Sequence, residues 1–299
     1  MNRIAVLLSL IILTFASCED KADDPVNQVD ENPDPNGCVF SGIEEDFLDC
    51  VSPTSADQLE VITWNIRQFP LDGNSTMEAV ERIIYNTDVD VIALQEIVSI
   101  TDFNTVADNL EGWEAQVVNI SSDLNMGYMY KTCEIESLST PTALNIIEPR
   151  PTVTTTIKHI NGLEVELFTL HLKCCGGTEN FERRATASEN LKQYIDTNLP
   201  GKPVIVLGDF NDHIGEGSPF TNFIADAENY LFTDMSIAQD ESASWSYPSY
   251  PSHIDHILIS DELFDNIETT KVITIEDCVW GYSFEVSDHR PVMAVFNKD

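Results

Sequence analysis

Side chains able to bind metal ions or transfer protons recur in this sequence directly after apolar runs. Carboxylates, carboxamides and imidazoles are groups that coordinate divalent cations and move protons in active sites. Ligands of sheet folds collect beyond strand ends, so polar residues that follow several strands are expected to meet. The residues at five such strand ends are Asn65, Glu96, His171, Asp209 with Asn211, and Asp288 with His289. The pattern therefore predicts one shared site.

Each of these residues also has a structural interpretation when taken alone. Gly-Asp-Phe-Asn, which contains Asp209, is typical of a turn stabilised by local hydrogen bonds. Taken alone, Glu96 is typical of a residue that caps the following helix, and His171 is typical of a histidine in the core. Asp288 is typical of a residue that stabilises a turn before the last strand. Their joint occurrence in this order favours the shared site.

Strands and helices alternate along the part of the chain that must position these residues. Asn161-Gly162 between two alternating runs predicts a hairpin, because Asn-Gly suits a tight turn with positive φ. Helices are predicted from residue 74 and over 179–198. Strands are predicted over 59–66, 89–96, 152–160, 163–172, 203–207, 254–259, 271–275 and 291–296. Hairpins mixed with crossover units predict an α/β fold with two mixed sheets packed face to face and helices outside.

Composition limits the class of protein. The chain has 299 residues, 42% of them hydrophobic and 9% aromatic, which excludes a disordered polymer and suits one large domain. With 51 Asp and Glu against 15 Lys and Arg, the net charge is −36. This charge argues against nucleic-acid binding through a broad basic face, but not against contact with phosphate through bound cations.

The N-terminal segment predicts export. A basic start and an apolar run that is too short to span a membrane indicate a signal peptide over 1–17. Ala16-Ser17-Cys18 resembles a bacterial lipobox, and the acidic residues after Cys18 resemble a surface-display tag. We therefore expect a lipoprotein anchored in the outer membrane through Cys18 and exposed at the cell surface, with a plain signal peptide as the alternative. An acidic tether follows over 18–36, an extension over 37–58 and a catalytic domain over 59–299.

Six cysteines remain after Cys18, which permits disulfides in an oxidising compartment. Cys38 and Cys50 suit a clip at the start of the domain. Cys174 and Cys175 suit either a vicinal bridge or pairing with distant partners. No cysteine spacing predicts a structural zinc site.

The ordered motifs resemble the endonuclease/exonuclease/phosphatase superfamily, which includes deoxyribonuclease I. The resemblance runs from about residue 59 to 296 and implies a four-layered α/β sandwich. It is specific for the superfamily but not for any one member. The motifs that carry it are Trp64-Asn65-Ile66, Leu94-Gln95-Glu96, Thr169-Leu170-His171-Leu172, Gly208-Asp209-Phe210-Asn211, Ile254-Asp255-His256-Ile257 and Ser287-Asp288-His289-Arg290-Pro291.

The resemblance also implies a cofactor and a set of residue roles. Mg²⁺, with Mn²⁺ as a possible substitute, is expected on Glu96 first and then on Asp288 and Asn65. Asp209 is expected to orient or deprotonate the attacking water, and is also a possible metal ligand together with Asn211. Asn211 is expected to donate hydrogen bonds to the phosphate.

The remaining roles concern proton transfer and phosphate binding. His289, with its tautomer fixed by Asp255, is expected to contact the phosphate or carry a proton. His171 is a candidate general acid without an identifiable carboxylate partner. Arg150 resembles the family arginine that grips phosphate, although a plain surface arginine is an alternative. Arg183 and Arg184 at the helix start either reach the substrate or, as the favoured interpretation, lie on a solvated helix face.

Three functions compete. The leading hypothesis is a metal-dependent phosphodiesterase, most simply a monomeric extracellular nuclease. A lipid or inositol phosphate hydrolase is the second, and a binding lipoprotein that has lost catalysis is the third. His253 and His256 are interpreted as structural. Trp245, Tyr247 and Tyr250 either stack on a substrate or pack a Pro-rich turn.

Overall fold

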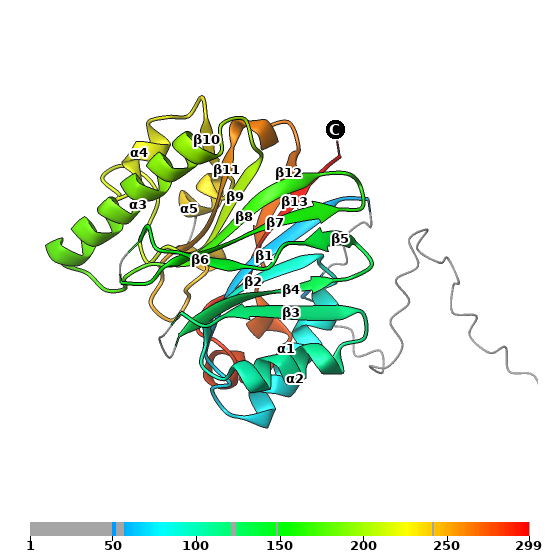
Figure 1. The fold of residues 1–299 in the computed structure, drawn as a ribbon. Coiled ribbons are helices and arrows are strands. Elements are labelled where there is room, and N and C mark those ends of the chain that lie inside the picture. Colours follow the sequence, from blue (N-terminus) through cyan, green and yellow to red (C-terminus); the bar gives the residue numbers. More distant parts are fainter. Residues whose placement is uncertain (1–49, 52–56, 121–123, 148, 241, 299) are drawn as a thin grey trace, which may run out of the picture. The chain divides into compact units, whose positions relative to one another are not determined.

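The computed structural model describes residues 50–51, 57–120, 124–147, 149–240 and 242–298. The predicted signal peptide, tether and most of the 37–58 extension lie outside these residues. The described residues form four layers, with two mixed β-sheets face to face and helices on their outer faces (Figure 1). The predicted fold class is confirmed.

Within the described residues, the first sheet has six strands in the order β12-β13-β1-β2-β4-β3. The central strands β1 and β2 run parallel, and β13 lies antiparallel on the other side of β1. The strands are β1 (Leu59–Phe69), β2 (Val91–Ile97), β3 (Trp113–Val118), β4 (Asn125–Lys131), β12 (Ile267–Val272) and β13 (Val292–Phe296).

The second sheet has seven described strands, in the order β10-β11-β9-β8-β7-β5 with β6 paired to β7. Here β8 and β9 are the parallel pair, and β11 lies antiparallel to β9. The strands are β5 (Ile135–Leu138), β6 (Thr142–Leu144), β7 (Thr152–His159), β8 (Glu164–His171), β9 (Val204–Asp209), β10 (Tyr230–Phe232) and β11 (Asp255–Ser260).

Helices cover the outer face of each sheet. Figure 1 shows α1 and α2 beside the first sheet, and α3 and α4 beside the second. In the described part of the chain, no helix has the length and apolar character needed to cross a membrane. The α-helices are α1 (Asn74–Thr87), α2 (Ile100–Asn109), α3 (Thr178–Asn198), α4 (Thr221–Ile224), α5 (Met235–Ala238) and α6 (Tyr282–Glu285). Short 3₁₀ turns are η1 (Ser242–Ser244), η2 (Asp261–Leu263) and η3 (Ile275–Asp277).

Alternation along the central strands builds three apolar cores. In β1, Leu59 and Val61 belong to the core between the sheets, whereas Ile62 and Trp64 belong to the core under α1 and α2. The same alternation in β9 divides its residues between the inter-sheet core and the core under α3. Because successive side chains of a strand point to opposite faces, both faces of each sheet must be covered. The near-continuous apolar runs of the sequence reflect this burial on both faces.

The structure differs from the sequence prediction in local detail. The hairpin at Asn161-Gly162 joins β7 to β8, but only Gly162 of the two has positive φ. Asn161 instead accepts a hydrogen bond from the Leu163 amide through its side chain, which provides another way to tighten the turn. The strand expected at 271–275 begins earlier, at Ile267, and the chain then enters η3.

One disulfide prediction is wrong. Cys50 pairs with Cys278, not with Cys38, so the clip joins the domain start to a loop before α6. Cys133 is also disulfide-bonded, and Cys174 and Cys175 are free thiols. A cysteine 228 residues away is close in space because η3 packs beside Cys50 and Val51, which the sequence alone does not reveal.

A buried acidic cluster lies where β1 and β2 begin. Asp90 is fully buried, accepts a hydrogen bond from the Glu60 amide at 2.8 Å, and has His159 Nε2 at 3.5 Å. Burial raises the pKa of Asp90 well above its usual range, and the neighbouring Glu134 and Glu60 raise it further. Lys131, which pairs with Glu134 and Asp88, supplies positive charge to the cluster. The folded protein therefore favours the protonated form of Asp90.

This cluster predicts a pH-dependent effect of Asp90→Asn. A carboxyl group whose pKa is raised by folding destabilises the protein as pH rises above its unfolded value near 4. Asparagine has no such titration, so the free energy of unfolding of the variant relative to wild type should grow with pH. The growth should be at most about 1.4 kcal/mol per pH unit, up to the folded-state pKa. Urea unfolding from pH 4 to 8 measures it, with the exposed Asp265→Asn as control. A difference that stays constant with pH would contradict the assignment.

Candidate active site

The ends of central strands from both sheets meet at one edge of the sandwich. Asn65 lies on β1 beside Gln95 of β2, and Glu96 follows Gln95. Asp209, the last residue of β9, pairs with His171 of the parallel β8 and with Asp255 at the start of the antiparallel β11. His289 precedes β13, which runs antiparallel to β1. Carboxyl ends of parallel strands and amino ends of their antiparallel neighbours thus share this edge.

An open cavity of about 1100 Å³ lies over this edge. The predicted residues that line it are Glu96, Arg150, His171, Asp209, Asn211, Asp288 and His289. Asn65 and Asp255 are buried directly behind them, at 1% and 0% exposure. The structure therefore brings all the predicted site residues together, while their roles stay predictions.

Unusual backbone conformations gather around the cavity. Six described non-glycine residues have positive φ, and five of them line it. These five are Arg67, Gln68, Glu96, Cys175 and Asn211. Such conformations cost on the order of 1–3 kcal/mol each and cluster at functional sites. These five residues therefore adopt unfavourable backbone conformations, which direct their side chains at the cavity.

Asn65 holds two carboxylates in place. Its Nδ2 donates to Glu96 Oε1 at 3.2 Å and to Asp209 Oδ2 at 3.0 Å. The Gln68 amide donates to the other Glu96 oxygen at 3.1 Å. Burial raises the pKa of Asp209 to about 7, with a further contribution from the charge of Asp255. Within the described residues, no Lys or Arg forms an ion pair with Glu96 or Asp209.

Asp255 and His289 form a buried acid–base pair. His289 Nδ1 lies 2.8 Å from Asp255 Oδ2, and its Nε2 faces Asp209 Oδ2 at 4.0 Å. Burial favours the neutral ring, but the charge and hydrogen bond of Asp255 outweigh it and raise the pKa of His289 to about 10. With Asp255 fixing the Nδ1 proton, Nε2 faces the cavity as a donor.

His171 lies between Glu96 and Asp209. Its Nε2 is 3.6 Å from Glu96 Oε1 and 3.5 Å from Asp209 Oδ2. Its Nδ1 is buried without a hydrogen-bond partner among the described residues, so no carboxylate supports the ring from behind. Burial lowers the pKa of His171 well below its usual value, and the Arg150 charge lowers it further. The ring is therefore neutral, with Nε2 directed at two carboxylates.

Asn211 and Arg150 are tied to the end of β8. Asn211 Nδ2 and Arg150 Nη1 donate to the Leu172 carbonyl at 3.1 and 3.3 Å. The Asn211 amide donates to Asp209 Oδ1 at 2.9 Å. Gly208 before Asp209 has to be glycine, because a Cβ there would overlap the Leu170 carbonyl. The Gly-Asp-Phe-Asn motif thus combines close contact between β9 and β8 at Gly208 with a positive φ at Asn211.

Asp288 has partners that sequence reasoning did not assign to it. Tyr247 donates to Asp288 Oδ2 at 3.4 Å and stacks at a tilt on His289, with 4.8 Å between ring centroids. Arg67 Nε lies 3.7 Å from the same oxygen. The only feature of the sequence that indicates Arg67 as a site residue is its position two residues after Asn65. Tyr247 belongs to the cavity wall, and Tyr250 is 77% exposed beside it.

Comparison with known protein families identifies the family to which this chain belongs. The model of the Endonuclease/Exonuclease/phosphatase family matches residues 62–289. The chain belongs to this family. The match spans every motif residue from Asn65 to His289, and members of the family are phosphoester hydrolases. A search of curated proteins found no match.

Solved structures show the same fold at low identity. The D. rerio TDP2 complex with single-strand DNA product is 15% identical, with TM-score 0.66 over 80% of this chain and 99% of that one. The human nocturnin catalytic domain with bound sulfate is 17% identical, with TM-score 0.61 over 81% and 95%. The mannosyl-6-phosphatase of Bacteroides thetaiotaomicron is 15% identical, with TM-score 0.60 over 80% and 99%.

The donor set of this family member fits a divalent cation. Glu96, Asp209 and Asp288 offer carboxylate oxygens at one cavity, and Asn65 holds two of them together. Oxygen donors of this kind suit hard cations such as Mg²⁺. Among the described residues no Lys or Arg pairs with Glu96 or Asp209, and the His289 imidazolium faces Asp209 Oδ2 at 4.0 Å, beyond hydrogen-bond distance.

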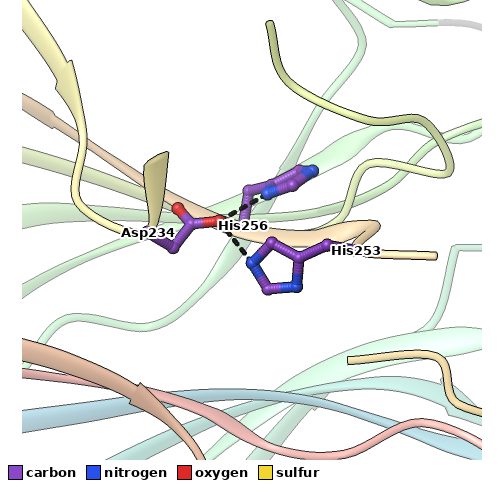
Figure 2. Close-up of side chains that lie close together, drawn as sticks. All are labelled: Asp234, His253 and His256. Atoms are coloured by element: carbon purple, nitrogen blue, oxygen red, sulfur yellow. Dashed lines mark hydrogen bonds and ion pairs between the residues drawn. The ribbon is translucent and has the colours of Figure 1, made fainter. Parts of the chain in front are cut away.

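A second His and Asp cluster is not a metal site. Figure 2 shows Asp234 between two imidazoles, with Oδ2 at 2.8 Å from His253 Nε2 and 2.5 Å from His256 Nδ1. The Ser246 amide donates to His253 Nδ1, so the proton of that ring is on Nε2. His256 Nε2 lies 2.9 Å from the Asp212 carbonyl, which can only accept a hydrogen bond. All four ring nitrogens are thus engaged, and none has a lone pair left for a metal.

The same hydrogen bonds make His256 an imidazolium. Both of its nitrogens face acceptors, so both carry protons while Asp234 is ionised. Burial opposes these charges, but each partner stabilises the other. The pKa of His256 is therefore raised, and that of Asp234 falls well below its usual range. This agrees with the structural interpretation of both histidines, and the pair supports the Asp212 loop beside Asn211.

Asp234→Asn is expected to destabilise the protein by about 3–5 kcal/mol, because it leaves a buried imidazolium without its counter-charge. Urea unfolding followed by circular dichroism measures the loss. Asp265→Asn, an exposed substitution of the same chemistry, should change the free energy of unfolding little. A loss below about 1 kcal/mol in Asp234→Asn would show that the buried pair is not ionic.

The two helix arginines have different surroundings. Arg183 is exposed and pairs with Glu179 on the same helix, as a solvated face predicts. Arg184 is 4% exposed and lines the cavity, so the solvated-face interpretation is wrong for this residue. Its guanidinium binds Asp212 Oδ2 through two nitrogens at 3.0 and 2.8 Å. Helix periodicity missed it because the buried partner comes from the loop after β9.

Proposed function

We propose that this protein is a divalent-metal-dependent phosphodiesterase that acts on nucleic acid outside the cell. The observation that carries the proposal is the convergence of Glu96, Asp209 and Asp288 with two histidines at one open cavity. Family membership supports phosphoester hydrolysis, and the DNA product named for the D. rerio TDP2 structure supports a nucleic-acid substrate. Tyr247 and Tyr250 offer aromatic surfaces for bases at the cavity wall.

The residues suggest how the reaction would proceed. Glu96, Asp288 and Asn65, with Asp209 beside them, would hold a divalent cation, which when bound neutralises the non-bridging phosphate oxygens. Asp209 orients a water and accepts its proton as it attacks phosphorus. Asn211 and His289 Nε2 donate hydrogen bonds to the charge that develops on the phosphate. His171, whose neutral ring is directed at the same carboxylates, would donate a hydrogen bond from Nε2 to the phosphate, and the His289 imidazolium would supply the proton to the leaving oxygen.

The net charge of −36 favours contact with single-stranded rather than double-stranded nucleic acid. A broad acidic surface repels a duplex, whereas a flexible single strand can enter a cavity whose charge is reversed by a metal ion. Arg67, Arg150 and Arg184 are the arginines that line the cavity. Short single-stranded substrates are therefore preferred over duplex DNA in this proposal.

A substrate screen tests the proposal. The purified chain is assayed with single-stranded DNA, RNA, bis(p-nitrophenyl) phosphate, sugar phosphates, inositol phosphates and sphingomyelin, each with Mg²⁺, Mn²⁺ or a chelator. The expected result is metal-dependent cleavage of diesters, with single strands cut faster than duplex. Hydrolysis of monoesters alone would make the protein a phosphatase, as the mannosyl-6-phosphatase likeness allows. No turnover with any substrate would favour a binding lipoprotein.

We also propose that Cys18 is lipidated and anchors the protein in the outer membrane at the cell surface. The lipobox-like Ala16-Ser17-Cys18 and the acidic residues after it support this. Fractionation of cells that express wild type or Cys18→Ser tests it. Wild type should be in the membrane fraction and accessible to external protease, and the variant should be released. Equal fractionation of the two would overturn the anchor.

A further inference from the structure

Two adjacent free cysteines lie at the edge of the candidate active site. Cys174 and Cys175 follow the end of β8 by three and four residues, and both line the same cavity as His171 and His289. Their sulfur atoms are 2.8 Å apart. Cys174 is partly buried and Cys175 is exposed, so solutes can reach the pair.

The backbone around the pair is held in an uncommon shape. Cys175 has φ +79°, a left-handed conformation that a cysteine rarely adopts. Arg184 Nη1 donates to the carbonyls of Lys173 and Cys175 at 2.7 and 3.0 Å, on both sides of Cys174. Because this guanidinium is buried and also bound to Asp212, it fixes the two cysteines with their sulfurs together.

The same segment supports residues of the site. The Leu172 carbonyl accepts hydrogen bonds from Asn211 and Arg150, two residues before Cys174. Arg184 connects the cysteine segment to Asp212, the residue after Asn211. These hydrogen bonds connect the backbone at Cys174 and Cys175 to Asn211 and Arg150.

We propose that Cys174 and Cys175 form a redox-active dithiol, oxidised by small-molecule disulfides to a vicinal disulfide that lowers the activity of the adjacent site. Two features favour reaction of this pair. Lys173 Nζ lies 3.7 Å from Cys174 Sγ, so a positive charge faces the sulfur that would react as a thiolate. The sulfurs are already in contact, so ring closure needs little further approach.

The oxidation is a pair of exchange steps. The Cys174 thiolate attacks one sulfur of the external disulfide, whose S–S bond breaks, and the departing thiolate takes up the proton released by Cys174. The Cys175 thiolate then attacks the Cys174 sulfur of the mixed disulfide, and the second external thiolate leaves with the proton of Cys175. The two cysteine sulfurs lose two electrons in total, and the external disulfide is reduced to two thiols.

The effect on activity follows from geometry. Closing the bond draws the sulfurs from 2.8 Å to about 2.05 Å and turns the peptide between them. A displacement of this size, passed to Asn211 and Arg150, is expected to lower kcat/KM about tenfold or more. The bond itself is independent of what the protein hydrolyses, whereas the activity effect rests on the proposed function.

Mass spectrometry tests the bond. The purified chain, with its Cys50–Cys278 disulfide intact, is incubated with oxidised glutathione and then alkylated. Trypsin cuts after Lys173 and Arg183, so both cysteines lie in one peptide. The expected peptide has lost two hydrogen atoms and carries no alkyl group and no glutathione. A peptide with two alkylated thiols, or one that keeps glutathione, would overturn the proposal.

Two further measurements test the coupling. Hydrolysis of bis(p-nitrophenyl) phosphate should fall about tenfold on oxidation and recover with dithiothreitol, while the Cys174→Ser/Cys175→Ser double variant should not respond. Amide hydrogen exchange over residues 209–213 should quicken in the oxidised protein whether or not a substrate is known. Full activity of the vicinal disulfide form, or unchanged exchange there, would overturn the regulatory role. Absence of turnover in reduced wild type would count against the proposed function alone.

Discussion

Glu96→Gln is expected to lower metal-dependent hydrolysis by a factor on the order of 10³. The substitution keeps the size of the side chain and an oxygen that accepts from Asn65, but it replaces the second oxygen, which accepts from the Gln68 amide, with an amide group and removes the negative charge. That charge has no Lys or Arg partner in the described part of the chain, so its main use is to attract a cation. The measurements are initial rates across a Mg²⁺ titration and Mn²⁺ binding by isothermal titration calorimetry.

The controls separate lost metal binding from lost folding. Glu228→Gln changes an exposed glutamate away from the cavity and should keep the wild-type rate. Thermal unfolding of Glu96→Gln without metal should stay close to that of wild type, because removing the partly buried charge relieves repulsion with Asp209 and offsets the loss of one hydrogen bond. Wild-type rates and unchanged Mn²⁺ affinity in Glu96→Gln would place the metal elsewhere.

The fold was predictable because its central strands are buried on both faces. The apolar runs of β1, β2, β8 and β9 are each recognisable, and their parallel pairs follow from the intervening helical segments. Strands outside the parallel pairs were harder to find. β3 and β4 carry mixed polar and apolar residues, and β6 has only three residues, so their pairing depends on neighbours that no local pattern encodes.

The site was predictable where chemistry and strand position coincide. His171 and Asp209 end β8 and β9, and Asn65 and Glu96 follow the apolar runs of β1 and β2, which makes all four recognisable by position as well as by type. Arg67 lies in the irregular last part of β1, Tyr247 on a loop and Arg184 on α3, and all three acquire their places from packing. Tertiary pairing also decides the disulfide, since Cys50 and Cys278 are 228 residues apart. Long-range contacts of this kind leave no spacing signal.

His289→Ala is expected to reduce kcat by about 10²–10⁴-fold, because it removes the donor that Asp255 directs at the substrate. His289 Nδ1 is bonded to Asp255 and its Nε2 faces Asp209, so the ring joins two buried carboxylates of the site. Asp255→Asn should cause a comparable loss, because an amide neither holds the Nδ1 proton in place nor supports an imidazolium.

His213→Ala is the control that tests whether any histidine at the cavity is sufficient or whether the aligned His289 is required. His213 also lines the cavity, but its side chain is 61% exposed and, among the residues that the structure describes, pairs only with the neighbouring Asp212. Its removal should change kcat less than about threefold, because an exposed imidazole is not aligned for proton transfer. Equal losses in the two variants would mean that general charge in the cavity, and not the aligned Asp255–His289 pair, sustains the reaction. A large loss in His289→Ala alone, with a normal thermal unfolding curve, identifies the pair as the acid–base unit.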